Sequence, residues 1–412
     1  MLITMGKQAK AASRVLAVAT TEQKNRALEA IARALEANTG DILAANAKDL
    51  ENGRNNNMSQ ALLDRLKLDE GRVRGIAAGV REVMALPDPI GRVLEETERP
   101  NGLRLVKVSV PLGVIGIIFE ARPNVSVDSA VLCLKSGNAV ILRGGSDAIH
   151  SNMALVAVMR KALESAGLPA DCVQLIEDTD RSTAVGLMKL NGYVDVIIPR
   201  GGAGLIQTVV RNATVPVIET GAGTCHLYID KAADLAMAAE IVYNAKTSRP
   251  SVCNAIECLL VHRDVAPEAL ELVEQRLQDK NVELRADARA WALLKTAVPA
   301  EDTDWGKEYN DYILAVHVVD SVEEAADFVN TYGTGHSECI VTADEAAAAY
   351  FMDHVDAAAV YHNASTRFTD GGEFGLGAEI GISTQKLHAR GPMGLRELTS
   401  MKYRVYGSGQ IR

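Results

Sequence analysis

The sequence has few aromatic residues, and Phe, Trp and Tyr together make up only 4% of its 412 residues. Its core must therefore be built mainly from Ala, Val, Leu and Ile. A chain of this length is too long for one compact core and predicts two or three domains. Basic residues are also in the minority, because 43 Lys and Arg against 53 Asp and Glu give a net charge of −10. This balance argues against a nucleic-acid partner.

The sequence also lacks the patterns of membrane, secreted and metal-binding proteins. No apolar run approaches the roughly 20 residues of a membrane-spanning helix, and residues 1–14 show no secretory signal. We therefore expect a cytoplasmic protein with no membrane partner. The six cysteines form no CxxC pair and the eight histidines no HxxxH spacing, so no metal site is expected. Most cysteines should be buried, small and reduced.

The first hundred residues predict helices. Apolar residues recur at helical spacing over 28–35 and again over 73–84. Thr20 with Gln23 has the pattern of a capping box before the first of these helices. A polar loop is expected at 51–59 and a turn at 86–91.

Short β-branched runs follow and alternate with helical stretches. This pattern predicts a doubly wound parallel sheet, and a second α/β section of the same kind comes after it. Residues 103–110 and the tail at 401–412 are strand-like and suit an edge exchanged between subunits. The first five strands are expected at 113–119, 138–144, 173–177, 194–199 and 215–219, and the second set at 226–229, 256–262, 312–319, 338–343 and 358–363.

Cys253 is the first candidate for chemistry. It lies in SRPSVCNA (248–255), just before a predicted strand, where a turn can expose the thiol and direct backbone N–H groups toward it. A thiolate is a strong acyl acceptor, and neighbouring donors lower the pKa of a thiol. A buried cysteine at the start of a strand is the structural alternative.

Two further candidates lie at the ends of predicted strands. One is an acidic residue and the other is a glycine-rich loop. Glu219 follows an apolar run, and open α/β sheets place their sites at the carboxyl ends of strands; a solvated charge is the alternative. IPRGGAGLI (198–206), with Gly201, Gly202 and Gly204, follows a strand and opens a helix, so its backbone can approach a phosphate. Its spacing is neither GxGxxG nor that of a Walker loop, and a plain glycine turn explains it equally well.

Three polar side chains at two other loops complete the candidates. Arg143 and Ser146 in ILRGGSDA (141–148) suit the 2′-phosphate of NADPH, unless Arg143 is only a surface residue. Asn124 in FEARPNVSVD (119–128) offers an amide for an oxyanion, or is an ordinary residue of a turn after a proline.

The order of these motifs resembles the aldehyde dehydrogenase superfamily, and specifically its γ-glutamyl phosphate reductase branch over essentially the whole chain. The residues that carry this resemblance include PSVCNA and RFTDGGEFGLGAEIGIST. It implies an α/β fold with two Rossmann-like doubly wound domains and a small β oligomerisation arm. The domains implied are a cofactor-binding domain at 1–100 and 113–224 with roughly 365–398, a catalytic domain at 225–364, and an arm at 101–112 and 399–412.

The resemblance also implies roles for single residues. Cys253 matches the family's nucleophile, Asn124 the oxyanion-holding Asn and Glu219 the general base. Arg143 replaces a lysine at the adenosine ribose, and Ser146 stands where NAD-preferring relatives often carry Glu, which favours NADPH. Glu308 matches a residue that holds the nicotinamide ribose. From charge and motif position we add the following substrate contacts: Arg122, Lys246, Arg249, Ser383 and Thr384.

The reaction implied is the reduction of L-glutamyl 5-phosphate by NADPH through a Cys253 thioester. A homo-oligomer and transient contact with a glutamate 5-kinase are the expected partners. A hydrolytic aldehyde dehydrogenase, with Glu219 activating water, is the nearest alternative. A cysteine acyltransferase would need a histidine near the thiol, and a non-catalytic nucleotide-binding module would rest on the glycine loop alone.

Overall fold

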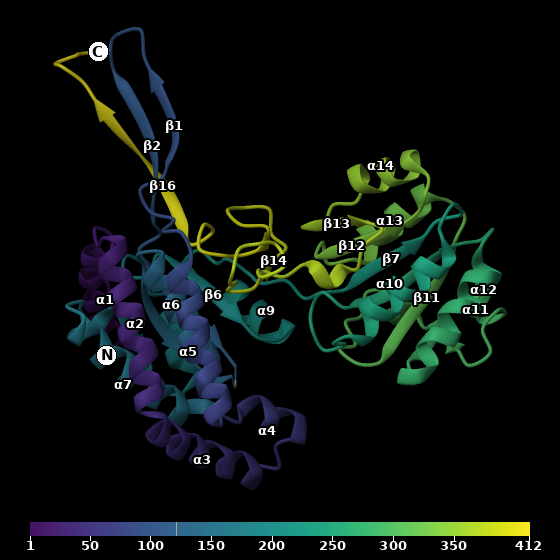
Figure 1. The fold of residues 1–412 in the computed structure, drawn as a ribbon, viewed down its shortest axis with the longest axis horizontal. Helices are drawn as coiled ribbons and strands as arrows, with labels where there is room; N and C mark the ends of the chain where they lie inside the picture. The colour runs from purple at the N-terminus through teal and green to yellow at the C-terminus, as the bar shows by residue number, and fades with distance from the viewer. Residues whose placement is uncertain (121) are drawn as a thin grey trace. The chain divides into compact units, whose positions relative to one another are not determined.

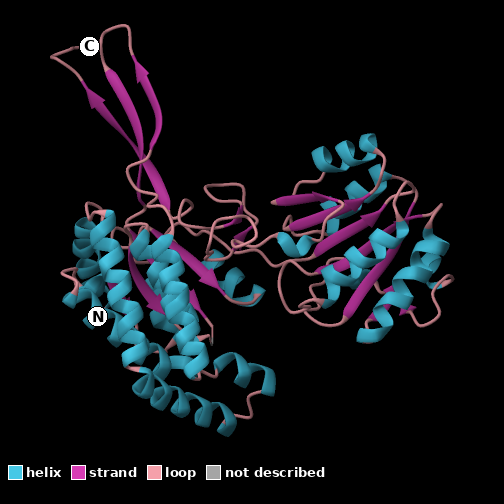
Figure 2. Ribbon diagram, in the orientation of Figure 1, coloured by secondary structure: helices cyan, strands magenta, loops and turns pink. Residues whose placement is uncertain are grey.

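The computed structural model describes residues 1–120 and 122–412 and divides them into two compact units. Unit 1 comprises Met1–Thr220, Gly375–Gly381 and Met393–Arg412, and unit 2 comprises Gly221–Phe374 and Ile382–Pro392. The C-terminal region therefore alternates between the units, with 382–392 belonging to the unit that contains Cys253. Figures 1 and 2 show each unit as helices packed around a sheet.

Unit 1 contains a four-stranded parallel sheet in the order β5-β4-β3-β6. Because crossovers between parallel strands are almost always right-handed, this strand order puts α6 and α7 on one face and α8 on the other. The strands are β3 (Val114–Phe119), β4 (Ala139–Arg143), β5 (Val173–Leu175) and β6 (Val196–Arg200). The helices are α1 (Leu2–Leu16), α2 (Thr21–Ala37), α3 (Thr39–Asn55), α4 (Gln60–Leu66), α5 (Glu70–Ala85), α6 (Pro123–Lys135), α7 (Ile149–Ser165), α8 (Arg181–Met188) and α9 (Ala203–Asn212), with 3₁₀ turns η1 (Ser146–Ala148) and η2 (Ala170–Cys172).

Local sequence explains where these elements begin and how they pack. The side chain of Thr20 accepts a hydrogen bond from the Gln23 N–H, and the Gln23 side chain accepts one from the Thr20 N–H, so the capping box at the start of α2 is confirmed. All six residues of β3 are buried, as expected for a strand covered on both faces.

Two expectations for unit 1 are wrong. Residues 215–219 form no strand: Val217 makes only an isolated bridge with Ile197, because Pro216 has no N–H to donate to a ladder. The sheet therefore has four strands among the described residues rather than five. The loop expected at 51–59 is also shorter, since α3 continues to Asn55.

A separate three-stranded antiparallel sheet belongs to unit 1. It pairs β1 (Val93–Glu98), β2 (Arg104–Pro111) and β16 (Thr399–Tyr406) in the order β1-β2-β16. Figure 1 shows this arm, with the last strand of the chain running beside β2. The strands expected at 103–110 and in the tail are thus confirmed, whereas β1 lies in a region where only helices were expected.

Unit 2 contains a seven-stranded parallel sheet in the order β10-β9-β11-β8-β7-β12-β13. Its inner strands are buried on both faces, with Leu227 in one apolar cluster and Tyr228 in the other. The strands are β7 (Cys225–Ile229), β8 (Ile256–His262), β9 (Glu283–Ala286), β10 (Val298–Pro299), β11 (Ile313–Val319), β12 (Ser337–Val341) and β13 (Ala359–His362). The helices are α10 (Leu235–Thr247), α11 (Ala266–Leu277), α12 (Ala288–Trp291), α13 (Val322–Tyr332) and α14 (Glu345–His354); shorter elements are η3 (Gln278–Lys280), η4 (Asp302–Asp304), η5 (Thr366–Phe368), β14 (Ile382–Ser383) and β15 (Gly391–Pro392).

Candidate functional site

Cys253 lies in the turn between α10 and β8 and is the most accessible of the six thiols. It is partly exposed, whereas the other five cysteines are buried, and none of the six forms a disulfide. Burial raises the pKa of Cys172 and of Cys339 to about 12, which keeps these thiols protonated at neutral pH. Because a thiolate is the reactive form, Cys253 is the best placed to act as a nucleophile.

The backbone of Cys253 is held by the loop that precedes β7. The Cys225 thiol donates a hydrogen bond to the Cys253 carbonyl at 3.1 Å. A Cβ on Gly223 would lie 1.5 Å from that same carbonyl oxygen, so only glycine fits. The Gly223 N–H in turn donates to Oε1 of Glu308 at 3.0 Å. The structure thus brings together two predicted residues, Cys253 and Glu308, through one glycine.

Asn254 is fixed from the other side by η5 and the residues around it. Its Nδ2 donates to the carbonyls of Thr369 at 2.9 Å and Arg367 at 3.3 Å, and its own carbonyl accepts from Oγ1 of Thr366 at 2.7 Å. Arg367 also donates to Oδ1 of Asn254, and its Nε donates to Oγ of Ser248 at 3.0 Å. Arg367 was not among the sequence candidates, although it begins the family-specific RFTDGGEFG segment.

Lys246 does not fit the substrate contact that the sequence suggested. Its side chain is 0% exposed and its Nζ lies 2.6 Å from Oε2 of Glu257, whose side chain is 1% exposed. Burial lowers the pKa of Lys246, and burial raises that of Glu257 to about 7. Its charge and motif position predict a substrate contact, but the Lys246 side chain is buried in unit 2 and its charge is already matched by Glu257.

The remaining substrate candidates differ in accessibility. Arg249 is exposed and forms no ion pair with a described residue. Ser383 is buried in β14, and Thr384 packs where a Cβ on Gly221 would meet its Cγ2 at 2.3 Å. Arg122, in unit 1, is exposed at the N-cap of α6.

The two other predicted catalytic residues belong to unit 1. Asn124 is in the first turn of α6, and its Nδ2 donates to Oδ2 of Asp128 at 2.8 Å. Glu219 is partly exposed and follows the isolated bridge at Val217. Asn124 follows β3 in the chain, as its motif predicted, whereas Glu219 follows only an isolated bridge and not the strand that was expected at 215–219.

The glycine loop at the start of α9 holds an anionic oxygen. Oε1 of Glu120 accepts from the Gly202 N–H at 3.3 Å, and Gly202 is the N-cap of the helix. A Cβ on Gly201 would lie 2.6 Å from the Glu120 carboxyl carbon, while Gly204 has open space around it. The N-terminus of α9 thus lies against a carboxylate, and a helix N-terminus favours a negatively charged group.

Arg143 at the end of β4 is directed onto a neighbouring loop. Its Nη2 donates to the carbonyl of Thr179 at 2.7 Å, and its buried Nε has no hydrogen-bond partner among the described residues. Burial lowers its pKa. Ser146 is exposed at the start of η1. The unpaired Nε and this exposed hydroxyl are compatible with an anionic group at the end of β4.

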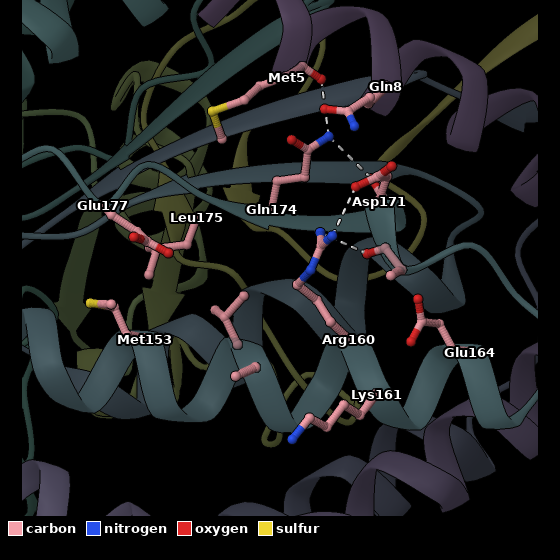
Figure 3. Close-up of a pocket in the computed structure, with 13 residues that line it drawn as sticks. Met5, Gln8, Met153, Arg160, Lys161, Glu164, Asp171, Gln174, Leu175 and Glu177 are labelled. Atoms are coloured by element: carbon pink, nitrogen blue, oxygen red, sulfur yellow. Dashed lines mark hydrogen bonds and ion pairs between the residues drawn. The ribbon is translucent and has the colours of Figure 1, made fainter. Parts of the chain in front are cut away.

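An open cavity of ≈ 490 Å³ lies elsewhere in unit 1, between α1, α7 and β5. Figure 3 shows the Arg160 guanidinium within it, turned toward Asp171 at 2.9 Å. None of the candidate residues lines this cavity. Among the described residues there is also no group of His, Cys, Asp and Glu suited to a metal ion, and no described helix is long and apolar enough to span a membrane.

Comparisons with known proteins identify the family and the fold. The sequence pattern of the aldehyde dehydrogenase family matches residues 3–292. A γ-glutamyl phosphate reductase of Moorella thermoacetica is 59% identical over 99% of this chain and 98% of its own, and one of Clostridium perfringens is 58% identical over 100% and 99%. The crystal structure of the Thermotoga maritima γ-glutamyl phosphate reductase is 47% identical and superimposes with a TM-score of 0.98 over 100% of this chain and 99% of that chain. An acetylating aldehyde dehydrogenase of Geobacillus thermoglucosidasius, at 18% identity and a TM-score of 0.69, shares the fold.

Proposed function

Because this chain belongs to the aldehyde dehydrogenase family, we propose that it reduces L-glutamyl 5-phosphate to L-glutamate 5-semialdehyde and phosphate with NADPH, the second step of proline biosynthesis from glutamate. Its full-length relatives are γ-glutamyl phosphate reductases. The observation that carries the proposal is the one accessible thiol, Cys253, in a turn braced on both sides. Such a thiol suits an acyl group with a good leaving group.

Covalent chemistry at Cys253 accounts for the use of an acyl phosphate. The thiolate sulfur bonds to the acyl carbon, and the bond from that carbon to the phosphate oxygen breaks, with the electron pair leaving on phosphate. Phosphate is a good leaving group, so this step needs no acid. The nicotinamide cofactor supplies the hydride that reduces the thioester. Collapse then breaks the carbon–sulfur bond and returns the thiolate of Cys253.

For Asn124 and Glu219 we propose the supporting roles that the family resemblance implies. The amide of Asn124 and the Cys253 backbone N–H hold the oxyanion. Glu219 moves protons and is not required to activate water, because no water enters the reductive direction. Its replacement therefore costs less activity than the loss of Cys253.

The cofactor loops favour NADPH. The Gly202 N–H at the start of α9 donates to a carboxylate oxygen of Glu120, and the loop of Gly201, Gly202 and Gly204 would hold a phosphate of the cofactor. Arg143 and Ser146 offer a cation and a small hydroxyl, where a carboxylate would repel a 2′-phosphate. Glu308 is the proposed contact of the nicotinamide ribose.

The assembly and location form a second part of the proposal. The arm exposes apolar side chains on β16, with Tyr403 58% and Val405 56% accessible, which favours a homo-oligomer built through this sheet. Transient contact with a glutamate 5-kinase would protect a labile substrate. A cytoplasmic location suits six cysteines that form no disulfide.

The reverse reaction tests the chemistry directly. We expect reduction of NADP⁺ by glutamate 5-semialdehyde only when phosphate is present, slower turnover with NAD⁺, and none in a folded Cys253→Ala variant. Turnover without phosphate would instead mean that water resolves the thioester, so the chain would be a hydrolytic aldehyde dehydrogenase with Glu219 at its centre.

A further inference from the structure

Arg367 bridges the two ends of the loop that contains the thiol. Its Nε donates to Oγ of Ser248 at 3.0 Å, and another nitrogen of the guanidinium donates to Oδ1 of Asn254. Ser248 precedes Arg249 in the chain and Asn254 follows Cys253. The guanidinium is thus held across the 248–254 loop, and its Nη2 has no hydrogen bond to a described residue.

A second guanidinium belongs to the same loop, because Arg249 directly follows Ser248, to which Nε of Arg367 donates at 3.0 Å. Burial and the positive charge of Arg249 both lower the pKa of Arg367, while the charges of Asp370 and of the Cys253 thiolate act in the opposite direction. Nη2 of Arg367 can therefore donate to a further partner, and Arg249 is exposed without an ion pair to a described residue. Two like charges held together beside a thiol are stabilised by an anion that bridges them.

We propose that Arg249 and Arg367 form a phosphate-binding subsite beside Cys253, which holds the phosphoryl group of the substrate as it leaves the acyl carbon. This inference rests on the proposed acyl-phosphate reaction and deepens it. Planar guanidinium groups match phosphate oxygens in a bidentate geometry. In the reverse direction the same pair holds the inorganic phosphate whose oxygen attacks the thioester carbon, so the carbon–sulfur bond breaks and the thiolate leaves.

If Arg367 had a purely structural role, the variants should behave differently. If Arg367 only braces the loop, then Asn254→Ala, which removes a bracing partner and keeps both guanidinium groups, should act like Arg367→Gln. In a phosphate subsite, Arg249→Gln and Arg367→Gln act alike, although Arg249 does not brace Asn254. The matched control is Arg263→Gln, since this exposed arginine follows β8 at the end of the strand away from Cys253.

The first measurement is the KM for inorganic phosphate in the reverse reaction at saturating aldehyde. We expect Arg249→Gln and Arg367→Gln to raise it about 10- to 100-fold each, as the loss of charge-assisted hydrogen bonds implies, with Arg263→Gln unchanged. An unchanged phosphate KM in both variants, or a rise confined to the KM for the aldehyde, would overturn the subsite. A wild-type reaction that needs no phosphate would instead refute the proposed function.

The second measurement needs no cofactor and no turnover. Iodoacetamide should alkylate Cys253 in the native protein, and inorganic phosphate should slow this reaction in the wild type and in Asn254→Ala. In each arginine variant the phosphate concentration for half protection should rise about 10-fold or more. Two outcomes would overturn the subsite. One is equal protection of Cys253 by phosphate in the wild type and both arginine variants. The other is no protection in a wild type that requires phosphate for turnover.

Discussion

Burial controls ionisation at single residues of unit 2, and His336 is the clearest case. This histidine is 0% exposed, its Nδ1 lies 2.8 Å from Oγ of Ser337, and its Nε2 has no partner among the described residues. Burial lowers its pKa from 6.5 to about 4. The imidazole is therefore neutral in the folded protein at every pH above that value.

The pH dependence of stability follows from this shift. Below pH 6.5 the unfolded chain binds a proton at His336 that the folded chain does not, so stability present above pH 6.5 is lost as pH falls toward 4. The loss from this group is about 3 kcal/mol at pH 4. Urea unfolding from pH 7 to pH 4 should show a correspondingly smaller loss in His336→Asn. The exposed His354, changed to Asn, should leave the profile unaltered; an equal profile in His336→Asn would contradict the shift.

Gly223 is a second residue whose effect can be predicted from geometry. A methyl group there would lie 1.5 Å from the Cys253 carbonyl oxygen, so the thiol loop must move. A displacement of about 1 Å at a reacting group costs roughly 100-fold in rate, and we expect kcat of Gly223→Ala to fall by about that factor. Gly40→Ala, which meets nothing within 4 Å, is the matched control. Wild-type kcat in a folded Gly223→Ala protein would show that the loop tolerates the displacement.

At the scale of single elements, two helices of unit 1 differ in how the replacement of a glycine by alanine should change stability. Gly75 in α5 has nothing within 4 Å of its missing Cβ, whereas in α1 a Cβ on Gly6 would lie 2.7 Å from Cβ of Tyr193. Gly75→Ala should raise the free energy of unfolding by about 0.5–1 kcal/mol, and Gly6→Ala should lower it. Urea titration of both variants checks the two signs, and a destabilised Gly75→Ala protein would contradict the open space around this position.

Most elements could be predicted because their signal is local. The buried strands of both sheets are apolar β-branched runs, and Thr20 with Gln23 marked the start of α2. The two expectations that are wrong have local causes: Pro216 cannot donate within a ladder, and α3 continues through polar residues to Asn55. The strand β1 was missed because its sequence, VLEETE, is mostly charged and exposed, and it is stabilised by pairing with β2 rather than by burial.

The candidate site was predictable only where it rests on short motifs. Cys253 in its turn and the glycines before α9 are of this kind. The contact of Arg367 with Asn254 joins residues 113 positions apart, which no local pattern reveals. Lys246 did carry a signal, since it follows Val242 by four positions on the buried stripe of α10, so its helical phase predicts an inward side chain.

At the scale of the whole molecule, the arm offers a test of assembly. Val405 on β16 is 56% exposed, and a charge at this position should weaken an interface made by the arm. We expect Val405→Glu to shift the proposed oligomer toward a monomer. Its dissociation constant, measured by light scattering across a dilution series, should rise at least about 10-fold. Val18→Glu, the same type of change at an exposed position after α1, should have no effect. An unchanged mass for Val405→Glu would place the interface elsewhere.

The pairing of β2 with β16 also has a consequence for synthesis. Arg104 pairs with Tyr406, so one edge of β2 stays unpaired until residues 399–406 have left the ribosome. Throughout translation of unit 2, the nascent chain therefore carries an unpaired strand edge, which is a site of misassociation. A protein whose translation stops before β16 would keep Cys253 and the glycine loop before α9. It would also keep an unpaired edge on β2, which favours aggregation.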